Sequence, residues 1–131
     1  MGPYHVVMSL RRRKGTRAHA FGLKAEDAAC AALAREGWTM LGRRVRTEAG
    51  ELDILAERDG VLAIIEVKAR PTLAAAARAL TPRLQARLLL AAEIVLATHP
   101  AWGVNGVRFD LLVVDAIGAV RRITDAFRVE W

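Results

Sequence analysis

The chain's 131 residues are sufficient for one domain with a core of its own, and a hydrophobic content of 53% excludes a largely disordered protein. A net charge of +6 favours a polyanionic partner, nucleic acid before an anionic membrane, although a basic surface without a special partner fits the same charge. No apolar run reaches the roughly 18 uncharged residues of a membrane helix, and the single cysteine excludes an internal disulfide, as expected in the reducing cytoplasm.

Residues 1–17 lack a sustained hydrophobic period, and we predict a flexible basic arm that precedes a single domain over residues 18–131. The arm's arginines and lysine suit contacts to phosphates without sequence reading, and a solvated tail is the alternative. No apolar run follows the basic cluster, so a secretory signal is not predicted.

Residues 18–36 are rich in alanine and predict a helix that stops at Gly37. Glu26 shares the apolar stripe of this helix with Ala29 and Leu33. A buried acid is costly unless it is paired or binds a metal. Two interpretations follow: Glu26 is a third carboxylate of a site on the sheet, or it lies at the edge of the stripe and reaches water.

Residues 38–46 predict a strand that carries three closely spaced arginines, Arg43, Arg44 and Arg46. Their position just before an acidic segment suits a phosphate backbone held beside a catalytic site. They are therefore candidate nucleic-acid contacts.

Residues 50–70 predict a hairpin whose turn is Asp59-Gly60, since both residues tolerate the positive φ of a type I′ turn. Arg58 then pairs with Val61. The flanking segments are apolar at nearly every position, which is typical of a strand covered on both faces.

This register places Asp53 opposite Glu66 and Glu51 opposite Lys68, with all four side chains on one face. Cβ atoms of opposed residues lie about 4.5–5.5 Å apart. Two carboxylates at that distance repel each other and need a counter-charge, which a divalent cation would supply and Lys68 would supply in part. A surface hairpin with a charged solvent face is the alternative.

Lys68 is the only lysine after residue 24 in a chain that otherwise uses arginine there. An ammonium can lose its proton or polarise a water molecule, whereas a guanidinium effectively cannot deprotonate. This choice of residue hints at a chemical role for Lys68 beside the two acids.

The segment 72–80 is ambiguous between helix and loop, and Thr81-Pro82 predicts the start of a helix that runs to about residue 98. Gln85 on that helix is a candidate helper at the site, with a surface glutamine as the default. Two further strands are predicted at 107–115 and 119–123.

These elements predict an α/β sandwich: a central mixed sheet of four to five strands flanked by helices. Arg108 and Asp110 share a face of one strand and are expected to pair. Phe127 in the tail is expected to pack onto the domain. No element suited to reading bases is present in the sequence pattern.

Asp53 followed by Glu66-Val67-Lys68 on the next strand resembles the core of the PD-(D/E)XK nuclease superfamily, which includes restriction endonucleases and Holliday-junction resolvases. Leu52 stands where the superfamily's name has proline, and Glu26 matches an acid often found on the first helix. The chain also resembles the small bacterial YraN family from about residue 22 to 127. That family usually has a lysine where Leu84 stands here. The matching residues are Gly22, Ala25-Glu26, Arg46, Gly50-Glu51-Leu52-Asp53, Glu66-Val67-Lys68, Arg70, Gln85 and Arg108-Phe109-Asp110.

The resemblance implies a restriction endonuclease-like fold and metal-dependent hydrolysis of DNA that is structure-selective or non-specific. Mg²⁺ or Mn²⁺ would be held by Asp53, Glu66, the Val67 carbonyl and Glu26. Lys68 would activate the attacking water and Gln85 would hold the water or a phosphate. Glu51 would orient Lys68, and the nucleic-acid contacts would be Arg43, Arg44, Arg46 and Arg70. A homodimer is expected by analogy with junction resolvases.

Two other functions stay open at this point. A non-catalytic module would use the basic surface to bind DNA or RNA, with salt-sensitive binding that does not depend on metal. A protein-interaction module would instead use the alanine-rich surface to form an oligomer and would not bind nucleic acid.

Overall fold

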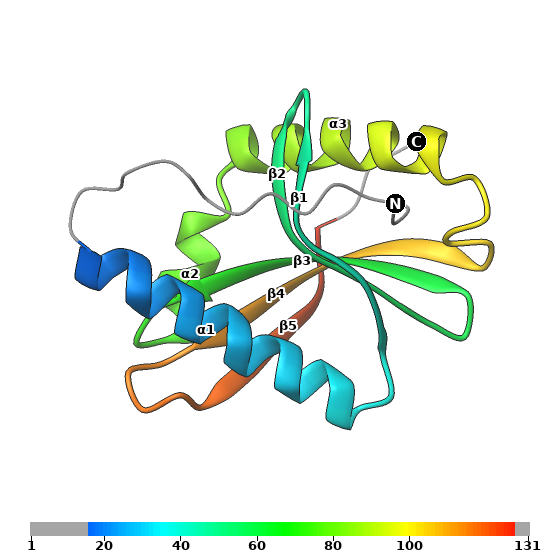
Figure 1. The fold of residues 1–131 in the computed structure, drawn as a ribbon. Helices are drawn as coiled ribbons and strands as arrows, with labels where there is room; N and C mark the ends of the chain where they lie inside the picture. The colour runs from blue at the N-terminus through cyan, green and yellow to red at the C-terminus, as the bar shows by residue number, and fades with distance from the viewer. Residues whose placement is uncertain (1–15, 128–131) are drawn as a thin grey trace.

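The structure of the chain is a computed structural model that describes residues 16–127, with side chains from residue 24 onward. Its centre is a five-stranded sheet with the spatial order β1-β2-β3-β4-β5 (Figure 1). The neighbours β3 and β4 run parallel and the other three pairs run antiparallel, which confirms the predicted mixed sheet. In chain order the elements are α1 (Thr16–Arg35), β1 (Thr39–Thr47), β2 (Gly50–Arg58), β3 (Val61–Ala69), α2 (Leu73–Ala79), α3 (Pro82–Thr98), β4 (Gly106–Val114) and β5 (Val120–Phe127).

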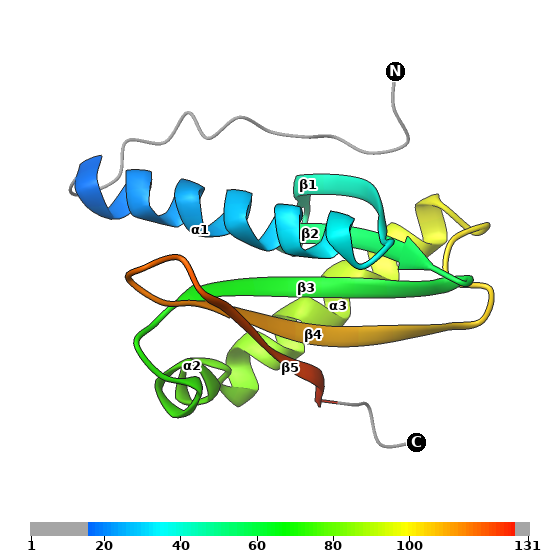
Figure 2. The same ribbon diagram turned by 90° about the horizontal axis from the view of Figure 1, so that it is seen from below.

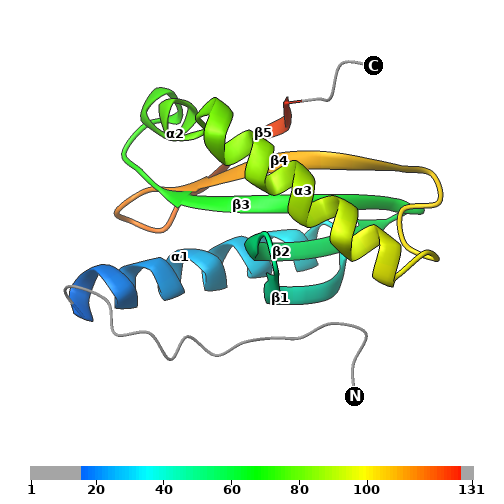
Figure 3. The ribbon, with the colours of Figure 1, turned by 90° about the horizontal axis from the view of Figure 1, so that it is seen from above.

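The helices lie on both faces of the sheet. Figures 1 and 2 show α1 along one face, and Figure 3 shows α3 crossing the opposite face. The predicted arm, residues 1–17, lies outside the described residues apart from its last two, which begin α1. Within the described part of the chain, none of the helices is long and apolar enough to span a membrane.

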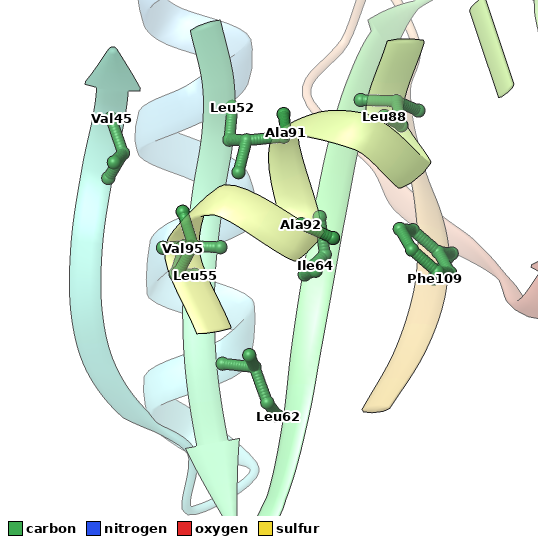
Figure 4. Packing of buried hydrophobic residues seen from close by; sticks show 10 residues of the cluster. All are labelled: Val45, Leu52, Leu55, Leu62, Ile64, Leu88, Ala91, Ala92, Val95 and Phe109. Carbon is green, nitrogen blue, oxygen red and sulfur yellow. The ribbon is translucent and has the colours of Figure 1, made fainter. Parts of the chain in front are cut away.

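The strand β3 packs on both faces, as its sequence predicts. Leu62 and Ile64 belong to a core under α3, whereas Ala63 and Ile65 belong to a core under α1. The core under α3 also receives side chains from β1, β2 and β4 (Figure 4). Its buried members are Val45, Leu52, Leu55, Leu62, Ile64, Leu88, Ala91, Ala92, Val95 and Phe109.

The end of α1 is a Schellman motif. Gly37 adopts a φ of 86°, the left-handed region in which glycine has no Cβ penalty. The N–H of Trp38 donates to the carbonyl of Leu33, and the N–H of Gly37 donates to that of Ala34. Trp38 and Leu33 also pack together in the core under α1. The predicted stop at Gly37 is confirmed.

The central hairpin has the predicted turn, with φ of 53° at Asp59 and 76° at Gly60. The predicted register is confirmed over five pairs, from Arg58–Val61 to Ile54–Ile65. The ladder stops there, so the predicted opposition of Asp53 to Glu66 and of Glu51 to Lys68 as strand partners is wrong.

The ladder stops because β2 leaves β3 and stays paired with β1. The tip of the β1–β2 hairpin rises toward α3 (Figure 1). Leu52 and Val45 there pack into the core under α3, and Arg87 of α3 donates from Nη1 to the carbonyl of Glu51 over 3.1 Å. Burial against α3 thus favours a bend that a flat hairpin lacks.

The remaining elements follow local signals, with two differences. The ambiguous segment 72–80 contains the helix α2. Thr72 is its N-cap, and the Thr72 side chain accepts a hydrogen bond from the N–H of Ala75. The strand β5 continues to Phe127, beyond the predicted residue 123. Phe127 stacks on Phe109 with ring centroids 4.5 Å apart, which confirms its predicted packing and explains the longer strand.

Thr81 is the predicted N-cap of α3, and its hydroxyl accepts the N–H of Leu84. We expect Thr81→Ala to lower the free energy of unfolding by about 1 kcal/mol. Thr98→Ala in the last turn of the same helix is the matched control, with an expected change below about 0.5 kcal/mol. Urea unfolding of both variants measures the difference, and equal losses would contradict the capping role.

Candidate active site

The candidate site lies where β2 leaves β3. Asp53 is the first residue of β2 past the end of the ladder, and its Oδ2 accepts the N–H of Val67 over 2.8 Å. The side chain thereby replaces the backbone carbonyl that a continued ladder would have offered. Half-buried Asp53 is held on a rigid strand and oriented by this bond.

The carboxyl groups of Asp53 and Glu66 lie in contact even though their backbones are not paired. The pKa of Asp53 is raised well above its ordinary value, mainly by burial and then by the negative charge of Glu66. The N–H of Val67 acts in the opposite direction because it favours the ionised form. Glu66 Oε1 is buried and has no hydrogen-bond partner among the described residues. A proton on Asp53 or a cation would satisfy that oxygen.

Lys68 brings a positive charge to the same place. Its Nζ lies 3.4 Å from Glu66 Oε2, and about one fifth of its side chain is exposed. Lys68 thus lies beside Glu66, one of the two acids that the prediction places next to it. The predicted contact with Glu51 is not formed, because Glu51 lies on the departing part of β2 and opposes Arg46 of β1.

Glu26 is buried on α1, so it does not lie at the edge of the stripe reaching water. Its Oε1 accepts from Arg44 Nε at 2.9 Å and lies 3.5 Å from Arg43 Nε. It is near enough to contribute to the raised pKa of Asp53, though less than Glu66 does. Across residues 24–127, whose side chains the structure describes, no three acidic, histidine or cysteine side chains are grouped to hold a metal ion. The structure thus gives Glu26 arginine partners and does not group it with Asp53 and Glu66 as a third ligand.

Arg44 is buried, with 9% of the residue exposed, and has a φ of 53°. Its guanidinium is turned inward to Glu26, an arrangement that does not favour the predicted contact with a phosphate backbone. The left-handed conformation is uncommon for a residue other than glycine, asparagine or aspartate. No sequence signal marks it, since arginine does not predict positive φ.

The three other candidate arginines differ in how free they are. Arg43 donates from Nη2 to Asp27 at 2.6 Å. Arg46 is exposed on β1, and half-buried Arg70 donates from Nη1 to the carbonyl of Ala69. Arg46 and Arg70 are therefore the two most available for a phosphate backbone.

Gln85 lies at the junction of α2 and α3. Its Nε2 donates to the carbonyl of Leu80 over 3.0 Å, a contact that ties the two helices together. Within the described part of the chain, no hydrogen bond joins Gln85 to Asp53 or Glu66. Its role as a catalytic helper remains a prediction.

The pair Asp53 and Glu66 fits a hard divalent cation. Mg²⁺ is commonly bound through one or two carboxylates and keeps several waters, so a third protein carboxylate is not required. Glu66 Oε1, which has no hydrogen-bond partner among the described residues, is a suitable metal ligand. The carbonyl of Val67 points to the same side of β3 as its N–H, which faces Asp53, and can add an oxygen there.

Comparison with known families places the chain. The model of the family described as "Uncharacterised protein family UPF0102" matches residues 25–114. The chain belongs to the UPF0102 family. The predicted resemblance to the YraN family is confirmed, since this is the same family. The matched segment of this UPF0102 protein contains Glu26, Asp53, Glu66 and Lys68, and ends before β5.

Curated relatives support the membership along most of the chain. A UPF0102 protein of Granulibacter bethesdensis is 61% identical over 117 residues, which cover 89% of this chain and 74% of the relative. One of Azorhizobium caulinodans is 44% identical over 119 residues, 91% of each chain. One of Rhodopseudomonas palustris is 42% identical over 106 residues, 81% of this chain and 82% of the relative. These names state no reaction, so chemistry has to be argued from the site.

The raised pKa of Asp53 has a consequence for stability. The pKa of Asp53 in the folded protein is raised above its ordinary value of 3.8. The stability that this shift contributes is fully present below pH 3.8 and is lost as the pH rises through the raised pKa. Asp53→Asn removes the charge and keeps an acceptor for Val67. We therefore expect its melting temperature, relative to the wild type, to be higher at about pH 8 than at about pH 4.

Asp59→Asn, in the exposed hairpin turn, is the control and should show no such dependence. Thermal melts of the three proteins at both pH values give the comparison. A difference in melting temperature between Asp53→Asn and wild type that does not change with pH would show that the pKa of Asp53 is not raised in the folded protein.

The buried pair Glu26–Arg44 should be important for stability. Arg44→Ala leaves Glu26 buried without its main partner, and we expect a loss of about 3–5 kcal/mol in the free energy of unfolding. Adding Glu26→Gln should recover part of that loss because the stranded charge is removed. Arg43→Ala, whose nearest partner Asp27 is exposed, should cost less than about 1 kcal/mol. Equal losses for the two arginines in denaturant titrations would refute the assignment.

Proposed function

We propose that the protein is a metal-dependent nuclease that hydrolyses phosphodiester bonds, with DNA as the first candidate substrate. The observation that carries this proposal is the contact between the Asp53 and Glu66 carboxyl groups. Glu66 Oε1 is buried without a partner among the described residues, and the Lys68 ammonium lies 3.4 Å from the other oxygen, Glu66 Oε2. Two acids held together at the cost of a raised pKa beside a lysine are typical of a functional site.

Each residue has a role that follows from its position. Asp53, oriented by Val67, and Glu66 would hold the cation, and Lys68 would position the attacking water and stabilise negative charge on the phosphorus centre. A bound Mg²⁺ or Mn²⁺ would polarise a phosphate oxygen and lower the pKa of a bound water. Glu26 would influence the site through Arg43 and Arg44, which it binds. Alternatively, it would release these arginines and become a ligand of the metal ion.

The order of the elements supports the resemblance to the PD-(D/E)XK superfamily. A helix, three antiparallel strands, a helical crossover and a parallel strand bring the acids to the point where two strands separate. This support concerns architecture, and the chemistry rests on the carboxylate pair and Lys68.

The substrate follows from charge. The net charge of +6, with exposed Arg46 and half-buried Arg70 as candidate contacts, suits a phosphate backbone in the cytoplasm. No element suited to reading bases enters the proposal, so selectivity would come from nucleic-acid structure, and a homodimer would match a two-fold substrate.

One observation favours a second candidate, a non-catalytic nucleic-acid-binding module. Glu26 is occupied by Arg43 and Arg44, which keeps the third acid of the predicted site away from metal binding. Such a module would bind nucleic acid in a salt-sensitive manner, and removing divalent metal would not change its affinity.

The decisive experiment compares two lysine variants on branched, flapped and single-stranded DNA with Mg²⁺ or Mn²⁺. Lys68→Ala should lower the cleavage rate by about 100-fold or more, since one electrostatic contact to the transition state is lost. Lys24→Ala, an exposed lysine of α1, should retain the wild-type rate. Equal rates for Lys68→Ala and wild type, or metal-independent binding with no cleavage by any of the three, would favour the binding module.

A further inference from the structure

A second charged feature lies away from the carboxylate pair. A pocket of about 420 Å³ opens between the last turn of α1 and the turn that joins β4 to β5. Neither Asp53 nor Glu66 lines it. Its lining residues are Ala32, Arg35, Glu36, Leu112, Gly118, Ala119, Val120, Arg121 and Arg122.

The pocket is positively charged. Three arginines line it, Arg35, Arg121 and Arg122, against one acid, Glu36. Arg122 Nη2 donates to Glu36 Oε1 over 2.5 Å, so that pair is neutral. Two guanidinium charges therefore remain without a lining counter-charge, and both belong to exposed residues.

Arg122 offers a donor that the protein leaves unused. Its Nε is buried and has no acceptor among the described residues. A buried donor without a partner is costly, and such atoms in folded proteins usually point to a ligand, an ion or a water. This donor belongs to a guanidinium whose Nη2 already donates to Glu36, so a contact to an oxyanion through two parallel bonds would come from Arg35 or Arg121.

Several negative groups near the pocket already accept hydrogen bonds from the protein. At the end of α1 the carbonyl of Leu33 accepts the N–H of Trp38, and the carbonyl of Glu36 accepts Arg58 Nη1. In the β4–β5 turn, Asp115 Oδ1 accepts two backbone N–H groups of its own turn. These contacts reduce the repulsion that a helix C-terminus and a nearby acid would otherwise exert on an anion.

We propose that this pocket binds a phosphate group in its dianionic, monoester form. The guanidinium groups of Arg35 and Arg121, which have no lining counter-charge, match a charge of about −2. Arg122 lines the same pocket, and its buried Nε has no acceptor among the described residues. The phosphate can come from inorganic phosphate or a small phosphorylated molecule, or from the phosphorylated end of a nucleic-acid strand. The site does not depend on the proposed nuclease activity, because it shares no residue with the carboxylate pair.

The first test titrates inorganic phosphate into the full-length chain and follows binding by calorimetry and by arginine side-chain NMR signals. Wild type should bind, and Arg121→Gln should bind about tenfold more weakly because a charge-assisted hydrogen bond is lost. Arg35→Gln, a second exposed arginine of the pocket, should behave in the same way. Arg83→Gln on α3, which does not line the pocket, is the matched control and should bind as the wild type does. Phosphate binding that is equal in all four proteins would overturn the proposal.

The second test identifies the source of the phosphate in an Asp53→Asn background, which removes a carboxylate of the proposed active site so that the probe is not cleaved through it. Oligonucleotides with a 5′-phosphate and with a 5′-hydroxyl are compared. An Arg121-dependent preference for the phosphorylated strand assigns the pocket to nucleic-acid ends. Equal binding of both strands, with inorganic phosphate still dependent on Arg121, assigns it to free phosphate or a small phosphorylated molecule.

Discussion

The hydrogen bond from the N–H of Val67 to the Asp53 carboxylate is the contact on which the candidate site depends. It closes the β2–β3 ladder at its last pair and lets β2 bend toward α3 without leaving a buried N–H unpaired. The same bond fixes the Asp53 carboxyl against Glu66. Fold and site thus share one constraint: where the strands separate, a carboxylate has to complete the ladder.

The site is held at a cost that the rest of the domain offsets. Burial beside Glu66 raises the pKa of Asp53, Arg44 adopts a left-handed backbone, and Glu66 Oε1 is left without a partner. Each of these features opposes folding, and such features concentrate at functional sites. The apolar cores on both faces of β3 provide the stability that allows them. A substitution of Asp53 that removes its charge is therefore expected to stabilise this family member at neutral pH and to abolish the proposed chemistry.

Charge is divided between two places in the domain. Asp53 and Glu66 gather where β2 and β3 separate, with Lys68 beside Glu66, while three arginines gather at the C-terminal end of α1. A polyanion would be repelled by the first place in the absence of metal and attracted by the second. This division is consistent with a protein that binds a phosphate at one location and reacts, when metal is bound, at another.

The sequence by itself determined most of the elements, the turn at Asp59-Gly60, the end of α1 at Gly37 and the proximity of Glu66 to Asp53 and to Lys68. Those features depend on local backbone preference and side-chain alternation, which neighbouring residues encode. Only the tertiary structure decided where the ladder ends, that Glu26 is bound by Arg44, and that Glu51 is carried away from Lys68. Those outcomes depend on the packing of the hairpin tip against α3 and on long side chains that choose among several partners. No local pattern specifies such a choice, because its free energy is set by burial and charge across segments distant in the chain.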